Sequence, residues 1–143
     1  MTAPAVVDGI ARTLAAAQSG WTYDPDAVLD PDLVPITLGD LPPDGIDAVT
    51  ITTYPGGPEP DSRNGWEYPR LQVRVRGANT LTALALDRAA YDVLQALSGV
   101  TLPGGTWWLQ DCHAIQSEAQ PMGVDANGRH EFSRNYQLTV LAG

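Results

Sequence analysis

The sequence predicts an α+β fold: a single domain over residues 1–143, with a mainly antiparallel sheet of four to five strands and two helices packed on one face. Three observations predict this fold. Two segments place apolar residues at helical spacings, other segments are rich in β-branched or alternating residues, and a tight-turn motif separates the last two strands. The length of 143 residues, with 43% hydrophobic and 17% charged residues, suits one globular domain.

The first helix is predicted over residues 3–18. Thr2 can cap it, Pro4 fits its first turn, where a missing N–H costs little, and Gly20 can end it. One buried stripe recurs at spacings of three and four residues and consists of Val7, Ile10, Leu14 and Ala17.

A proline-rich connection follows over residues 22–45. Proline disfavours helix at and before itself, so at most a short strand around residues 35–38 is expected there. Residues 46–54 are predicted to form a strand, because they contain an unbroken run of β-branched residues. Residues 55–65 are rich in Pro and Gly and are predicted to form a mobile loop.

The middle of the chain predicts one strand and the second helix. Residues 68–76 alternate, with apolar side chains on one face and Arg or Gln on the other. The helix is predicted from Asn79 or Thr80, either of which can cap it, to Ser98, before a closing glycine. Its apolar stripe consists of Leu86, Ala90, Val93 and Leu97, widened by Tyr91 and Leu94.

Two further strands are predicted over residues 106–115 and 131–141. In the second of these, one apolar face is interrupted by Arg134 and otherwise consists of Phe132, Tyr136, Leu138 and Val140. Between the two strands, the sequence Asp-Ala-Asn-Gly at residues 125–128 contains the Asn-Gly pair that is typical of a tight hairpin turn.

Charge is distributed unevenly along this chain of net charge −9. Residues 1–61 contain ten acidic residues against Arg12, whereas residues 62–143 contain seven acidic residues and seven arginines. The chain has no lysine, which excludes Schiff-base chemistry and a P-loop lysine. Its excess of negative charge disfavours non-specific binding to nucleic acid and to anionic membranes.

No motif for catalysis, a metal or a cofactor emerges, so we expect a protein that is not an enzyme. The acidic run from Asp24 to Asp32 lacks the glycine and the bidentate glutamate of a calcium loop. Cys112 and His113 are neighbours on a predicted strand and point to opposite faces, which leaves only a cross-strand pair of Cys112 with His130. The single cysteine excludes an intramolecular disulfide, and with no apolar run of membrane-spanning length a cytoplasmic site of synthesis is expected.

Arginine and tryptophan provide the candidate interface residues. Three guanidinium groups on one strand face repel one another unless acids or another chain meet them. Their partners are either another subunit or nucleic acid, or, within the fold, Asp87, Asp92 and the acidic first half. Adjacent tryptophans on a strand cannot share one core, so one of them is expected under a helix, in a loop-covered site or in a protein interface. Interfaces are enriched in tryptophan and arginine together, which favours the interface. The candidates are Arg70, Arg74, Arg76, Trp66, Trp107, Trp108 and Arg134.

From Tyr68 onward the sequence resembles the minor capsid or tail terminator proteins of phages with long, non-contractile tails. The likeness covers residues 68–141 and depends on an ordered set of segments rather than on one motif. These segments are Pro69–Gly77, the helix Leu84–Leu97, residues 100–104, the Gln120-Pro121 step and Asp125–Tyr136.

The resemblance implies an α+β subunit of a homohexameric ring at the head–tail junction of the virion, assembled in the host cytoplasm. Such a ring caps the head-proximal end of the tail tube and stops its polymerisation. Its partners would be other copies of itself, the major tail tube protein and a head-completion or stopper protein, with phage DNA passing through the lumen. The alternatives are another neck component, such as a stopper or adaptor, or a small cytoplasmic ligand-binding or enzymatic domain.

Overall fold

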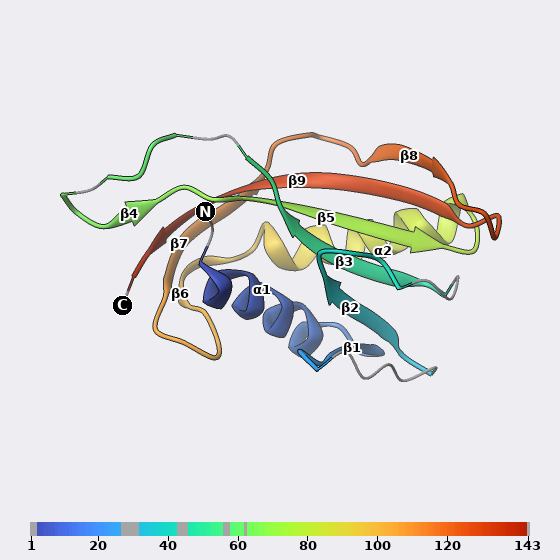
Figure 1. The fold of residues 1–143 in the computed structure, drawn as a ribbon, viewed down its shortest axis with the longest axis horizontal. Helices are drawn as coiled ribbons and strands as arrows, with labels where there is room; N and C mark the ends of the chain where they lie inside the picture. The colour runs from blue at the N-terminus through green and yellow to red at the C-terminus, as the bar shows by residue number, and fades with distance from the viewer. Residues whose placement is uncertain (1–2, 27–31, 43–45, 56–57, 62, 143) are drawn as a thin grey trace.

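A computed structural model describes residues 3–26, 32–42, 46–55, 58–61 and 63–142. In this part of the chain, two helices lie under one face of a curled, mixed sheet of nine strands (Figure 1). The helices are α1 (Pro4–Ala17) and α2 (Thr80–Leu94). The strands are β1 (Trp21–Tyr23), β2 (Val34–Leu38), β3 (Ala48–Thr53), β4 (Trp66–Glu67), β5 (Arg70–Gly77), β6 (Ser98–Thr101), β7 (Trp108–Ala114), β8 (Gln120–Val124) and β9 (His130–Leu141).

The main path through the sheet runs β1-β2-β3-β5-β9-β7-β6, with β4 and β8 also paired to β9. The pairings β1–β2 and β2–β3 are parallel, and the others are antiparallel. Both predicted helices lie on one face, which confirms that part of the predicted fold class. The expected count of four to five strands is wrong, because β1, β4 and β6 are too short to show a period in the sequence, and β8 contains Pro121 and Gly123, which are depleted in strands.

The longer elements lie where the sequence predicts them. The short strand expected around residues 35–38 is β2, and the hairpin turn at residues 125–128 joins β8 to β9. The Asn79 side chain accepts a hydrogen bond of 2.9 Å from the Thr82 N–H, so this residue caps α2 as predicted. Thr2, the expected cap of α1, lies outside the described residues, and the N-cap position is taken by Ala3, which makes no side-chain cap.

The second helix ends earlier than predicted. It stops at Leu94 instead of Ser98, and residues 98–101 form β6. The β-branched residues Val100 and Thr101 explain the difference, because they pair with Leu109 and Trp108 on β7. The apolar spacing of Val93 and Leu97 mimics a continuing helix in the sequence.

The core lies between the sheet and the two helices. Alternation along β5 buries Leu71, Val73 and Val75, and alternation along β9 buries Tyr136, Leu138 and Val140. On α1 the predicted stripe is buried except for Ala17, which is exposed, and Val6 and Ala11 extend the stripe instead. No helix in the described residues has the length and apolar character needed to cross a membrane.

Polar contacts tie α1 to β1. The Tyr23 hydroxyl donates a hydrogen bond of 2.7 Å to Asp8, which also forms an ion pair with Arg12 at 2.7 Å. Burial, followed by the neighbouring Asp8 carboxylate, raises the pKa of Tyr23 to about 12. The hydrogen bond from Arg12 lowers the pKa of Asp8 below its ordinary value of 3.8. Asp8 and Arg12 therefore satisfy each other within the subunit.

Candidate functional site

The sheet face opposite the helices carries most of the predicted interface residues; we call it the helix-free face (Figure 1). Because Leu138 and Val140 are buried on the helix side, the odd-numbered residues of β9 and their cross-strand partners lie on the other side. Its members on the central strands are Arg70, Gln72, Arg74, Arg76, Glu131, Ser133, Asn135 and Gln137.

Side chains of β5 and β9 form a ladder of polar contacts across the helix-free face. The Arg70 Nε donates to the Gln137 Oε1 at 2.9 Å, and the Gln72 amide donates to the Asn135 Oδ1 at 3.3 Å. Arg74 forms an ion pair of 2.7 Å with Glu131. The prediction that Arg70, Arg74 and Arg76 share one strand face is confirmed, and Arg74 already has a carboxylate partner inside the subunit.

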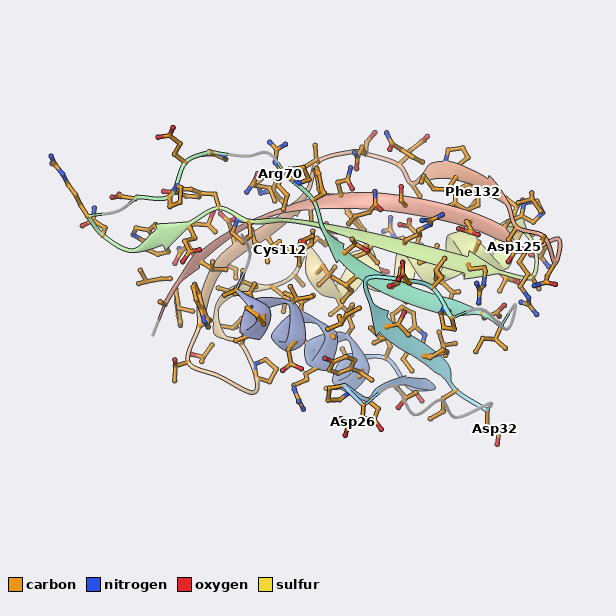
Figure 2. All side chains as sticks on the ribbon, viewed as in Figure 1. Asp26, Asp32, Arg70, Cys112, Asp125 and Phe132 are labelled. Carbon is orange, nitrogen blue, oxygen red and sulfur yellow. The ribbon has the colours of Figure 1, made fainter. Side chains whose placement is uncertain are left out.

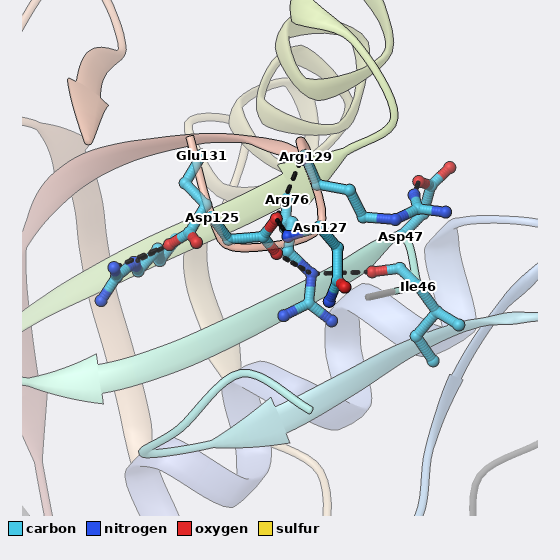
Figure 3. Close-up of polar contacts among 8 residues, drawn as sticks. Ile46, Asp47, Arg76, Asp125, Asn127, Arg129 and Glu131 are labelled. Atoms are coloured by element: carbon cyan, nitrogen blue, oxygen red, sulfur yellow. Dashed lines mark hydrogen bonds and ion pairs between the residues drawn. The ribbon is translucent and has the colours of Figure 1, made fainter. Parts of the chain in front are cut away.

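Arg76 belongs to a second network, which braces the β8–β9 hairpin (Figure 3). Its Nε donates to the Ile46 carbonyl at 2.9 Å and lies 3.9 Å from an oxygen of Asp125. Asp125 also accepts hydrogen bonds of 2.9 Å from the backbone N–H groups of Asn127 and Arg129. Arg129 in turn forms an ion pair with Asp47, so the hairpin is fixed to the segment that enters β3.

The Asp125 carboxylate predicts a pH-dependent contribution to stability. The pKa of Asp125 lies below the ordinary 3.8, and the largest cause is the hydrogen bond from the Arg129 N–H. Burial raises this pKa, whereas the hydrogen bond from the Asn127 N–H and the charges of Arg76 and Arg129 lower it further. A carboxyl whose pKa is lowered by folding stabilises the folded state above its ordinary pKa, and this stability is lost as the pH falls through the lowered value.

Asp125→Asn is therefore expected to lower the free energy of unfolding near neutral pH, and the gap from the wild type should narrow below about pH 4. Urea unfolding of both proteins between pH 7 and pH 3 measures the gap. Asn127→Ala is the control, because only the backbone N–H of Asn127 donates to the Asp125 carboxylate, so this variant keeps both the carboxylate and its hydrogen bond. A gap that stays constant with pH would contradict the expectation.

Two tryptophans come together at the far end of the helix-free face. Trp66 on β4 and Trp108 on β7 are both direct cross-strand partners of Leu141 on β9, so the three side chains form a row on one face. We call Trp66, Leu141 and Trp108 the aromatic row; all three are half-buried. The Trp108 ring packs over Gly99 on β6, 3.5 Å from where a Cβ on that glycine would be, which is ordinary van der Waals contact.

Trp107 points the other way and packs against the core, which confirms that the adjacent tryptophans face opposite sides. Of the predicted aromatic candidates, Trp66 and Trp108 are therefore brought together, whereas Trp107 is separated from them. Sequence reasoning missed Leu141, which joins the two. No local signal marks it, because its role depends on the pairing of β9 with both β4 and β7.

Arg134 is located on the helix side of β9. Its guanidinium contacts both carboxylate oxygens of Asp87 on α2, at 3.2 and 2.8 Å, and lies 4.5 Å from the centre of the Tyr91 ring. The two charged side chains are 7% and 4% exposed. Burial alone would lower the pKa of Arg134, but the hydrogen bonds and charge of Asp87 raise it. Within this subunit, Arg134 holds α2 on the sheet.

The residues considered for catalysis or metal binding are not brought together. Cys112 is buried, and burial raises the pKa of its thiol to about 12, whereas His113 is exposed. Cys112 on β7 lies opposite Leu138 on β9, and His130 is eight residues before Leu138 on β9. Cys112 and His130 are therefore roughly 27 Å apart. No group of three or more potential metal ligands occurs in the described residues; Asp30 of the acidic run lies outside them.

One surface hollow of about 410 Å³ lies between α2 and the end of β7, lined by Tyr91, Gln95 and residues 112–117. Its cysteine has a raised pKa, and its histidine is paired at 3.8 Å with Asp111 on the same strand. The cysteine of this hollow is therefore not activated as a nucleophile.

Comparisons with known proteins agree with an assembly role. Residues 17–141, from the end of α1 through β9, match the model of a family described as "Bacteriophage tail terminator protein". A chain in the solved structure "Virion of native gene transfer agent (GTA) particle" is similar in fold, with a TM-score of 0.52 and 19% identity over 75% of this chain and 78% of that chain. No curated protein sequence matches the chain.

Proposed function

The chain belongs to the bacteriophage tail terminator family, a family of structural proteins and not of enzymes, and from this premise we propose that it forms a ring of six subunits that caps the head-proximal end of the tail tube. The ring stops tube polymerisation and joins the tail to a head-completion or stopper protein. Its direct partners are other copies of the chain, the tail tube protein and that neck protein. The observation that carries the proposal is the family match over residues 17–141.

The distribution of charge supports a ring. A cyclic assembly uses one heterologous contact repeated around an axis, so each subunit needs two different, complementary surfaces. The first 61 residues hold ten acidic residues and one arginine, while all the other arginines lie in the rest of the chain. The rest of the chain is neutral overall, with seven acidic residues and seven arginines, so we propose that an acidic surface of the first part meets an arginine-bearing surface of the next copy.

Net charge also suits passage of DNA through the ring. Six subunits of charge −9 give the assembly a strongly negative field, which disfavours retention of phosphates. We propose that the lumen is acidic and releases DNA freely. A structure of the ring with a lumen lined mainly by arginine would overturn this second proposal.

The function is tested by combining the purified chain with tail tube protein. Native mass spectrometry of the chain, alone and with tubes, is expected to show a species of six times 15.2 kDa. Electron microscopy is expected to show rings at one end of each tube and an arrest of further growth. Binding to the head connector without binding to tube ends would instead identify a stopper or adaptor, and a monomer that binds neither would overturn the proposal.

A further inference from the structure

We propose that the contact between neighbouring subunits joins the aromatic row and two flanking arginines of one copy to an acidic edge of the next copy. The flanking arginines are Arg63 and Arg70. The acidic edge consists of β1 and the turn that follows it, with Asp24 and Asp26. The inference rests on the proposed ring and names the surfaces that close it.

The two arginines differ from the others in their charge partners. Every other arginine of the chain forms an ion pair with a carboxylate of the same subunit. Within the described residues, Arg63 and Arg70 have no such partner: Arg63 is exposed, and Arg70 contacts the Gln137 amide and lies 6.0 Å from the Tyr54 ring centre. The subunit therefore presents two uncompensated positive charges.

Both charges lie near the same end of the sheet as the aromatic row, with Arg70 opposite Gln137, four residues along β9 from Leu141. Arg63 is in the turn that leads into Trp66, where the Asp61 and Trp66 backbones pair, and Arg70 begins β5, just after β4. Clusters of tryptophan and arginine at the centre of a surface are typical of the residues that dominate binding energy at protein interfaces. Trp66, Leu141 and Trp108 present such a centre on a face that no helix covers.

The acidic edge supplies the complementary charge. Asp26 is exposed and Asp24 is half-buried, and neither has an arginine partner in the described part of the chain. Asp24 accepts a hydrogen bond of 2.8 Å from the Asp26 N–H, which orders the turn. Asp8, which lies nearby on α1, is occupied by Arg12 and Tyr23, so Asp24 and Asp26 remain available for a neighbour.

The two surfaces cannot meet within one subunit. In the sheet, β1 is separated from β9 by β2, β3 and β5, which places the strands roughly 19 Å apart. Figure 2 likewise shows Asp26 and Asp32 on the opposite side of the molecule from Arg70. Because every copy carries both surfaces, pairing them between copies produces the head-to-tail contact that a ring requires.

Charge swapping tests the contact. The basic-surface variant Arg63→Glu/Arg70→Glu and the acidic-edge variant Asp24→Arg/Asp26→Arg are each expected to lose the ring, with roughly a tenfold or greater fall in its population by native mass spectrometry. An equal mixture of the two variants is expected to restore a ring of alternating subunits, because each junction again joins opposite charges. Circular dichroism and thermal melting check that each variant is folded.

The matched control is Arg88→Glu, because Arg88 is exposed on α2 and pairs with Asp92 of its own helix. This variant is expected to assemble like the wild type. If the wild type forms a ring and both charge-swapped variants form it equally well, the proposed contact is wrong, while the proposed function is unaffected. A ring that persists but no longer binds tube ends would overturn it as well and assign the surface to the tube protein. Failure of the wild type to form a ring, alone or on tubes, counts against the proposed function itself.

Discussion

Asp87→Ala is expected to lower the free energy of unfolding by about 3–5 kcal/mol, the largest effect we expect for a single substitution in this chain. The substitution leaves the Arg134 guanidinium charged and buried, with its strongest hydrogen-bond partner removed. Among the described residues, the acceptor that remains is the Ser117 carbonyl, 3.4 Å from one of the guanidinium nitrogens. Urea unfolding followed by circular dichroism measures the loss.

Two further variants test whether the loss of stability comes from the burial of the unpaired charge. Asp92→Ala breaks a similar ion pair on the same helix, but the side chains of Arg88 and Asp92 are 67% and 52% exposed, so a change of at most about 0.5 kcal/mol is expected. Asp87→Leu/Arg134→Met removes both buried charges and is expected to recover most of the stability. Similar losses for Asp87→Ala and Asp92→Ala would contradict the explanation.

Gly77→Ala is expected to cost about 1–3 kcal/mol, because a methyl group has no room at the end of β5. A Cβ at this position would lie 2.5 Å from the Ala83 nitrogen and 2.9 Å from its Cα, both in the backbone of α2. A side chain can rotate away from such a clash, but here the first turns of the helix must move. Thermal melting is expected to show a fall of several degrees.

The control for this substitution is Gly105→Ala. A Cβ at Gly105 would have its nearest neighbour at 3.7 Å, in ordinary van der Waals contact with the Ala5 Cβ. It is expected to change stability by no more than about 0.5 kcal/mol. An equal loss at Gly77 and Gly105 would show that the contact with α2 is not responsible, because the change in backbone entropy from Gly to Ala favours the folded state at both positions.

The sequence predicts those parts of this fold in which many residues repeat one pattern. The helix before β1 and the strands β3, β5 and β9 are long enough for a period to be visible, and the Asn-Gly turn has a local signature. The three-residue strand β1 and the two-residue strand β4 have no period to detect. They exist because β2 and β9 offer them a free edge, which is a property of the assembled sheet.

The candidate surface was harder to predict for the same reason. Alternation along one strand places Arg70, Arg74 and Arg76 together, but it does not identify their partners. Within the subunit, Arg74 and Arg76 pair with Glu131 and Asp125, and the expected partner Asp87 pairs with Arg134 instead. These pairs join residues far apart in the sequence: Arg74–Glu131 depends on strand register over 57 residues, and Arg134–Asp87 depends on the packing of α2 on the sheet over 47 residues. The role of the candidates between subunits stays a prediction.

The pairing of β9 with β4, β5, β7 and β8 also determines the order in which the chain can fold. These four strands all precede β9, so during synthesis they have no shared partner until residues 130–141 leave the ribosome. Folding that depends on such distant pairings is slow compared with local helix formation, and it leaves strand edges open in the meantime. Trp66 and Trp108, the two outer members of the aromatic row, both pair with Leu141, the last residue of β9. An incomplete chain therefore lacks the aromatic row, which is the surface that we propose a neighbouring copy contacts.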